Sequence, residues 1–164
     1  MIEPIHTPDV VEPLLPPRIE NGIRKLFETR IPFNVLLGLR IDTMTREGVS
    51  ASFGMQPQLV GNFTHGILHG GVTAAVLDAV AGTAIYTSIA FANLGESIEA
   101  SAARFGSMST IDLRIDYLRP GRGQHFIAHA RVLRLGKKIA STRMELIGDD
   151  GQLIAAGAAA FYVG

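Results

Sequence analysis

A single carboxylate stands alone in a long apolar part of the sequence. Between Gly48 and Gly95 only Asp78 carries a formal charge, although a chain that is 18% charged would place about nine charged residues in a stretch of that length. An isolated carboxylate in apolar surroundings is costly, and burial raises its pKa. Because perturbed carboxylates concentrate at active sites, Asp78 is a candidate general base or nucleophile. The other interpretation is a structural aspartate, held by hydrogen bonds at a subunit contact.

Two glycines follow a histidine where the helix carrying Asp78 is expected to begin. His69, Gly70 and Gly71 are consecutive, so two glycine amides fall among the unpaired N–H groups of the first helical turn. Glycine lets a ligand approach the backbone, and a helix N-terminus favours developing negative charge. Asp78 follows Gly70 by eight residues, a little over two turns, so both can face one side. The pattern indicates an oxyanion-stabilising amide beside a carboxylate; the alternative is a plain turn before a helix.

The histidines argue against a metal site. His65 and His69 are four residues apart, but Gly66 weakens a helical placement, and no cysteine or nearby carboxylate completes a ligand set. We therefore predict no metal. His125 and His129 fall in an expected strand and are interpreted as ordinary, partly exposed histidines.

Positive charge gathers in one part of the chain. Between Tyr117 and Met144 there is no acidic residue and there are seven basic ones: Arg119, Arg122, Arg131, Arg134, Lys137, Lys138 and Arg143. One interpretation is a solvated pair of hairpins, and the other is a cradle for an anionic ligand such as a nucleotide phosphate. The net charge of +0 suits a small phosphate-bearing molecule better than nucleic acid.

Two helices and six strands are expected to position these residues. Residues 69–90 are alanine-rich and too long for a strand, which predicts a helix. An earlier helix over 19–27 is expected to end at Pro32. Alternating apolar residues predict strands at 39–42, 49–53 and 110–117, and turn signals at 120–121, 136–137 and 150–151 separate three more. The segment between the long helix and the strand at 110 is expected to be a loop.

This element order predicts the α+β class, an antiparallel sheet with one face covered by a long apolar helix. The alternative for that helix is a membrane span. Asp78 near its middle opposes this, because a charge there costs about 2.5–3.5 kcal/mol on insertion scales. No basic residue flanks either end, so we predict no membrane span.

Composition fits one domain. The chain has 164 residues, 47% of them hydrophobic, enough for a sizeable core. Five of the eight prolines fall within residues 1–17, so we predict an extended arm there and a single domain over 18–164 with an extra N-terminal helix. Cysteine is absent, which excludes disulfides and thiol nucleophiles. The first residues lack the basic start and apolar run of a signal peptide, so we expect a cytoplasmic protein.

Several segments together resemble the PaaI-like acyl-CoA thioesterases of the hotdog fold. The resemblance rests on residues 68–72 followed by Asp78, on 109–120 and on 135–137, and it covers residues 33–163. Within this group, the approach to the helix through Gly61 and Asn62 looks most like bacterial medium- and long-chain acyl-CoA thioesterases of the YigI type. The family fold is a curved antiparallel sheet wrapped around one long central helix, in agreement with the expected element order.

The resemblance implies a role for each residue of the site. Asp78 matches the catalytic carboxylate, Gly70 the amide that polarises the thioester carbonyl, and His69 the histidine at the helix start. Thr110, contributed by the partner subunit, matches a hydroxyl that places the water or the carboxylate. Asn62 resembles a water-orienting asparagine, although it precedes His69 by seven residues rather than six.

The resemblance also implies where the substrate binds. CoA is expected near Arg119 and the turn around Gly136. The implied substrate-binding residues are Gly71, Arg119, Arg134, Gly136, Lys137 and Lys138. The acyl chain is expected between the long helix and a partner subunit, against Val72, Ala75 and Leu77.

The implied activity is hydrolysis of acyl-CoA thioesters to free acid and CoA by carboxylate-assisted attack of water, on medium- to long-chain acyl groups. The implied assembly is a homodimer or homotetramer with active sites at the subunit interface and no cofactor. One alternative is a hotdog hydratase or dehydratase acting on acyl thioesters, which the spacing from His69 to Asp78 disfavours. Another is a non-catalytic acyl-CoA-binding hotdog protein.

Overall fold

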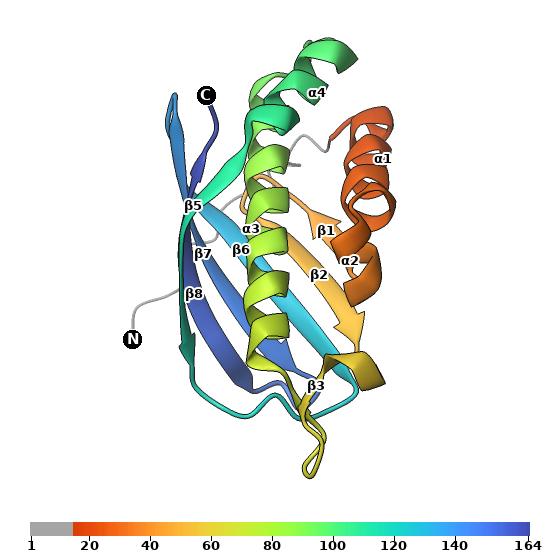
Figure 1. Cartoon of the computed structure of the whole chain (residues 1–164). Helices are drawn as coiled ribbons and strands as arrows, with labels where there is room; N and C mark the ends of the chain where they lie inside the picture. The colour runs from red at the N-terminus through yellow and green to blue at the C-terminus, as the bar shows by residue number, and fades with distance from the viewer. Residues whose placement is uncertain (1–14) are drawn as a thin grey trace, which may run out of the picture.

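A computed structural model describes residues 15–164, built on an antiparallel sheet that wraps around a central helix (Figure 1). The arm predicted for residues 1–17 lies outside the described residues, apart from its last three. The sheet has the strand order β1-β2-β6-β7-β8-β5. Its strands are β1 (Arg40–Met44), β2 (Val49–Gly54), β5 (Ser109–Tyr117), β6 (His125–Leu135), β7 (Ile139–Gly148) and β8 (Leu153–Tyr162). All neighbouring pairs are antiparallel, so the predicted α+β architecture is confirmed.

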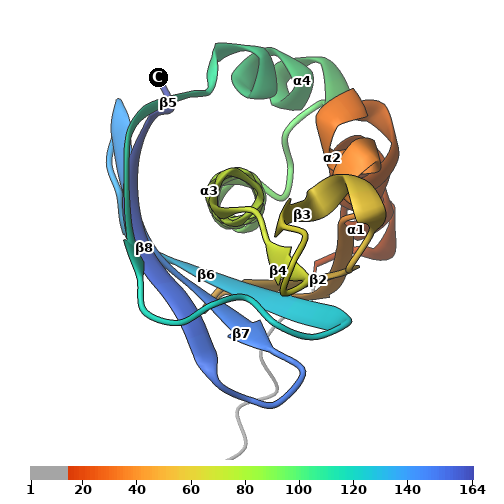
Figure 2. The same cartoon turned by 60° about the horizontal axis from the view of Figure 1, so that its bottom comes forward.

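The central helix, α3 (Gly70–Ala92), lies in the concave face of the sheet (Figure 2). Thirteen of its 23 residues are buried, because the sheet covers one side and shorter helices cover much of the other. By length and hydropathy alone α3 is able to cross a membrane, but 67% of its apolar window is buried inside the protein. Burial of this kind is typical of the core helix of a fold.

The inner face of the sheet supplies the other half of the core. Side chains of β6 and β7 alternate between buried and exposed, and the buried ones, such as Phe126, Ala128, Met144 and Leu146, pack beneath α3. The three predicted turns all fall between the strands they were expected to separate. The strand part of the prediction therefore holds at every element from β5 to β8.

The N-terminal region forms two helices rather than the one predicted. α1 (Pro17–Lys25) continues into a π-helical turn (Leu26–Arg30), and Pro32 begins α2 (Pro32–Leu37) instead of only closing the segment. Proline suits this position because the first residue of a helix has no intrahelical partner for its N–H. Gly38 then ends α2 with φ of 69°, a left-handed conformation that favours glycine.

α4 (Ile98–Ser107) occupies the segment expected to be a loop, and a short hairpin that was not predicted precedes α3. α4 follows α3, and Ser97 Oγ accepts a hydrogen bond from the Ala100 amide at 3.2 Å at its start. A 3-10 turn (Pro57–Leu59) leads into a short hairpin, whose strands are β3 (Val60–Asn62) and β4 (Ile67–Leu68). In Figure 2, α1, α2 and α4 lie on the side of α3 that the sheet leaves open.

Candidate active site

Asp78 lies on α3 beside β5, the strand at one edge of the sheet. Thr110 Oγ1 donates a hydrogen bond to Asp78 Oδ1 over 2.9 Å, and Asp78 is half-buried. Burial raises the pKa of the Asp78 carboxyl above its ordinary value, and the hydrogen bond from Thr110 opposes part of that rise. Both residues belong to one chain, whereas the resemblance implied a Thr110 from the partner subunit. The hydrogen bond that orients the Asp78 carboxylate is thus formed within one chain, without a partner subunit.

Small residues surround Asp78 on its face of α3 and leave room for a cavity. Ala75, Ala79 and Gly82 lie within about one helical turn of it and line a cavity of about 260 Å³ together with Asp78 and Thr110. The facing walls are mostly apolar and come from Phe27, Ile31, Phe33, Phe105, Met108 and Phe161, with Asn34 and Ser109 as polar members. An apolar pocket therefore begins at the carboxylate.

Only part of this lining was expected from the sequence. Ala75 lines the cavity, but Val72 and Leu77 do not, and Leu77 is wholly buried. The missed walls come from three places: the N-terminal helical segment, most of which lies outside the resemblance, α4, which was expected to be a loop, and Phe161 of β8. Helical spacing of apolar residues around Phe27 indicated a face to bury, but nothing in the sequence indicated what that face would contact.

The start of α3 offers one free amide rather than the two expected. His69 Nδ1 accepts a hydrogen bond from the Gly71 amide at 2.9 Å, so Nδ1 is the unprotonated nitrogen of the ring. This bond occupies Gly71. The Gly70 amide has no hydrogen-bond partner among the described residues, and Gly70 is exposed. Of the two glycine amides, only that of Gly70 is therefore free to bind a ligand, and its role as an oxyanion donor stays a prediction.

Contacts on both sides hold this helix start in place. Tyr117 Oη, at the end of β5, donates to the Gly70 carbonyl oxygen at 2.8 Å. On the other side, β3 passes so close that a Cβ on Gly61 would lie 2.7 Å from His69 Cα. Only glycine allows this approach. The position of the Gly70 amide is thus set by β5 and by the hairpin together.

Asn62 lies next to Gly61 in the same hairpin. Its Oδ1 accepts a hydrogen bond from the Thr64 amide at 3.1 Å, and the residue is exposed. The side chain therefore closes the turn at the hairpin tip, which leaves the Nδ2 group as the one free to contact a water. The water-orienting role remains a prediction.

Gly70 and Asp78 lie too far apart to act on one carbonyl within a single chain. Eight residues of α-helix correspond to about 12 Å along the axis, so the expectation that both face one small site needs correction. β5 runs beside this part of α3, with Thr110 at Asp78 and Tyr117 at Gly70. Asp78 consequently lies beside one end of the edge strand β5, and Gly70 lies beside its other end.

The expected CoA-binding residues also divide into two groups. Arg119 lies in the loop after β5, and its Nη1 donates to the Leu153 carbonyl oxygen at 3.0 Å. Arg134, Gly136, Lys137 and Lys138 lie at the far end of β6, in and before its turn to β7 (Figure 1). β6 is 11 residues long, which separates its ends by about 33 Å. One chain therefore does not bring the two groups together.

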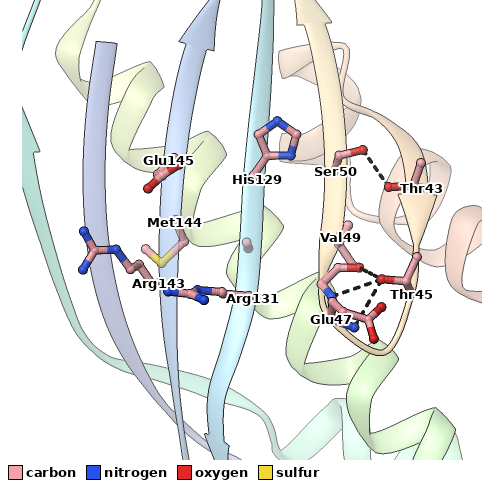
Figure 3. A pocket seen from close by; sticks show the side chains of 12 residues that line it. Thr43, Thr45, Glu47, Val49, Ser50, His129, Arg131, Arg143, Met144 and Glu145 are labelled. Carbon is pink, nitrogen blue, oxygen red and sulfur yellow. Dashed lines mark hydrogen bonds between the residues drawn. The ribbon is translucent and has the colours of Figure 1, made fainter. Parts of the chain in front are cut away.

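A larger but open depression lies on the outer face of the sheet, away from α3 (Figure 3). It measures about 550 Å³ and is lined by residues such as Ser50, His129, Arg131 and Arg143. Arg131 and Arg143 belong to the basic stretch between Tyr117 and Met144, but none of the residues to which the resemblance assigns a role lines this depression. Neither there nor elsewhere in residues 15–164 do three or more His, Cys, Asp or Glu side chains form a group placed to hold a metal ion.

Known proteins share this fold and much of this sequence. The family model of the Thioesterase superfamily matches residues 65–155. A Salmonella typhimurium protein named medium/long-chain acyl-CoA thioesterase YigI is 40% identical over 142 residues, which cover 87% of this chain and 92% of that protein. The Escherichia coli protein of the same name is 39% identical over the same shares. A solved structure from Shewanella oneidensis, described as related to the thioesterase superfamily, matches with a TM-score of 0.84 and 39% identity, covering 90% of this chain and 96% of that one.

Proposed function

The chain belongs to the thioesterase superfamily, and from this premise we propose that it hydrolyses acyl-CoA thioesters of medium- to long-chain acids to free acid and CoA. The observation that carries the proposal is the half-buried Asp78, oriented by Thr110 at the mouth of an apolar cavity. Such a cavity suits an acyl chain, and a carboxylate at its mouth suits the activation of water. The names of the relatives at 39–40% identity support the substrate class.

In the proposed reaction, ionised Asp78 accepts a proton from water while the water oxygen attacks the thioester carbonyl carbon. The carbonyl oxygen gains negative charge and accepts a hydrogen bond from a Gly70 amide. The tetrahedral intermediate then collapses, the C–S bond breaks, and CoA leaves as a thiolate that takes up a proton. The raised pKa of Asp78 makes the carboxylate a stronger base than an exposed aspartate. Direct attack by Asp78, followed by hydrolysis of the resulting anhydride, would use the same groups.

The amide that meets this oxyanion is proposed to be the partner subunit's Gly70. Within one chain Gly70 is about 12 Å from Asp78 along α3. Antiparallel pairing of two β5 strands about their midpoints would set the Thr110 end of one beside the Tyr117 end of the other. The same two-fold axis would bring Asp78 to the partner's Gly70 and create two equivalent sites. In support, β5 is an edge strand, and Tyr117 on it is 55% exposed.

A second contact is proposed to join two such dimers into a homotetramer. Apolar side chains are exposed along β6 and at the start of β7, among them Ile127, Leu133 and Ile139 at 41%, 56% and 54%. Exposed apolar groups of this size favour burial against another subunit. The dimer already contains the complete proposed site, so the tetramer would add stability rather than chemistry.

The phosphates of CoA are proposed to lie beside Arg119. Its loop touches the end of β4, two residues before α3, where the Leu68 amide donates to the Gly121 carbonyl oxygen at 2.9 Å. Arg119 is therefore close to the helix terminus that carries the Gly70 amide. A guanidinium suits phosphate through paired hydrogen bonds. Lys137 and Lys138, at the other end of β6, are the competing candidates.

We further propose that the reaction takes place in the cytoplasm, with water as the only co-substrate and without a metal or other cofactor. A thiolate is a good leaving group, so the chemistry calls for a base and an oxyanion donor rather than a strong acid. Asp78 and the Gly70 amide provide these two functions.

Thiol release from acyl-CoAs of increasing chain length tests the proposed function. The parent protein is expected to release CoA, and Asp78→Asn to lose about 10²–10⁴-fold in rate while still binding substrate. Asp42→Asn, at an exposed position on β1, is the matched control and should keep the parent rate. Binding without turnover by the parent would instead favour an acyl-CoA-binding protein. Hydration of an enoyl-CoA without thiol release would favour a hydratase or dehydratase.

A further inference from the structure

A second, largely apolar cavity lies directly beyond the one that contains Asp78, with polar side chains such as Arg18, Asn93 and Glu96 also in its lining. It has a volume of about 500 Å³ and lies between α1, the C-terminal half of α3 and α4. Side chains such as Ile23, Leu26 and Ile89 line it. Phe105 of α4 lines both cavities, so a single side chain forms part of the wall between them.

Three aromatic rings, Phe27, Tyr86 and Phe105, form this partition. Phe105 packs edge-on against Phe27 and Tyr86, with ring centroids 5.7 and 5.6 Å apart. Tyr86 is anchored to α4, because its hydroxyl lies 2.6 Å from Ser101 Oγ. Phe105 has no polar group, is half-buried and is held by ring contacts. It is therefore the ring that can turn aside at the lowest cost.

The partition stands at the far end of the cavity that starts at the carboxylate. Asp78, Gly82 and Tyr86 follow one another at intervals of four residues along one face of α3. An extended chain with its carbonyl at Asp78 would pass Gly82 and reach Tyr86 after about 12 Å. Chains longer than this meet the three rings.

We infer that the second cavity is a distal acyl-binding compartment, entered by long acyl chains when Phe105 turns aside, whereas shorter chains end at the partition. This inference rests on the proposed function. Each methylene moved from water into an apolar cavity contributes about 0.8 kcal/mol, or about fourfold in affinity. A chain that enters the compartment therefore gains binding energy that a shorter chain does not, and Phe105 becomes a determinant of chain-length preference.

Two opposite changes test the inference. Phe105→Ala joins the cavities, and Phe105→Leu does so in part while keeping more of the packing. Both should raise the ratio of kcat/KM for palmitoyl-CoA to that for octanoyl-CoA. Gly22→Leu places a side chain in the second cavity, where a Cβ on Gly22 meets nothing within 4 Å. It should lower that ratio by about tenfold or more, mainly through KM for palmitoyl-CoA.

Gly106→Leu is the matched control, because a Cβ on Gly106 also meets nothing within 4 Å and the residue lines neither cavity. It should leave the ratio unchanged. Equal ratios in the parent, Phe105→Leu and Gly22→Leu would overturn the distal compartment and leave thioester hydrolysis standing. If the parent hydrolyses no acyl-CoA, the proposed function fails. In that case the distal compartment is tested by the shift in Tm on addition of palmitate. Palmitate should raise the Tm of the parent more than that of Gly22→Leu, and equal shifts would overturn the compartment.

Discussion

At Asp78, burial and one hydrogen bond act on the protonation equilibrium in opposite directions. Because the base must be ionised, activity should fall as pH drops through a raised pKa, at a higher pH than for an ordinary aspartate near 3.8. Thr110→Val removes the interaction that lowers the pKa. We therefore expect the acid limb of kcat/KM to move to higher pH in this variant.

A pH–rate profile on octanoyl-CoA provides the measurement. Thr29→Val, at an exposed threonine of the π-helical turn, is the control and should reproduce the parent limb. An acid limb that stays in place in Thr110→Val would show that the hydroxyl does not act on the carboxylate.

The same equilibrium affects stability. The folded-state pKa of Asp78 lies above its unfolded value, so the folded protein binds the proton more tightly, and the ionised carboxylate costs stability above the folded pKa. Asp78→Asn removes that cost. At pH 7 its Tm should equal or exceed that of the parent, and the difference should shrink as pH falls through the raised pKa toward 3.8. A variant that is less stable at pH 7 would mean that the carboxylate is a structural hydrogen-bond acceptor.

The two candidate sites for the CoA phosphates, beside Arg119 and beside Lys137 and Lys138, lead to opposite predictions for substitutions at these residues. If the phosphates lie beside the start of α3, Arg119→Ala should raise KM for acyl-CoA about tenfold and have little effect on the matching acyl-pantetheine. Replacing Lys137 and Lys138 by alanine should then change neither substrate. The reverse result would assign the phosphates to the β6–β7 turn.

Single residues were predictable where their chemistry conflicts with their surroundings. Asp78 is identifiable because it is the one charge in an apolar stretch. Gly71 was expected to offer a free amide and does not, because a cap from the His69 ring depends on a side-chain rotamer that sequence does not reveal. Thr110 was recognisable as a hydroxyl position, but which chain supplies it depends on how β5 lies against α3.

At the scale of elements, the hairpin of β3 and β4 sets the position of the start of α3. Gly61→Ala would place a Cβ 2.7 Å from His69 Cα, where backbone must move. The backbone movement that relieves this contact should displace the nearby Gly70 amide. This displacement should lower kcat about 10- to 100-fold while the protein stays folded. Gly95→Ala, with nothing within 4 Å of its Cβ, should retain parent activity. Circular dichroism together with thiol release separates a lost site from a lost fold.

The strands and α3 were predictable because their patterns are strong. Apolar residues alternate in β5, turn signals separate β6, β7 and β8, and α3 is too long and too rich in alanine to be a strand. Pro32 shows the limit of such signals, since proline both ends one helix and suits the first position of the next. α4 was missed because serine and glycine interrupt its sequence, although half of its ten residues are apolar, and because it is held by contacts of Phe105 with Phe27 and Tyr86.

At the scale of the whole molecule, the proposed two-fold axis passes near the middle of β5. The chain has no cysteine, so introduced thiols report on that axis. The double variant Asp112→Cys/Arg114→Cys should give a disulfide-linked dimer on mild oxidation. Leu113 is the middle residue of β5, so pairing about it sets residue 112 of one strand opposite residue 114 of the other, close to the Cα separation of about 4.4–6.8 Å that the bond requires. Arg114 pairs with Asp116 at an exposed position, so its loss should cost little.

Arg40→Cys, on β1 at the opposite edge of the sheet, is the control and should remain unlinked. Non-reducing electrophoresis distinguishes the two variants. Light scattering that shows a stable monomer at micromolar concentration would rule out both the β5 dimer and a site shared between subunits.

The position of α3 in the chain has a consequence for how the protein is made. Residues 70–92 leave the ribosome before β5 to β8, which cover them and end at residue 162. At about 5–20 residues per second, synthesis of the 70 residues between takes about 4–14 s. Throughout that interval a mostly apolar helix lacks four of the six strands of its sheet. The nascent chain is therefore expected to be a client of ribosome-associated chaperones until its last strand is made.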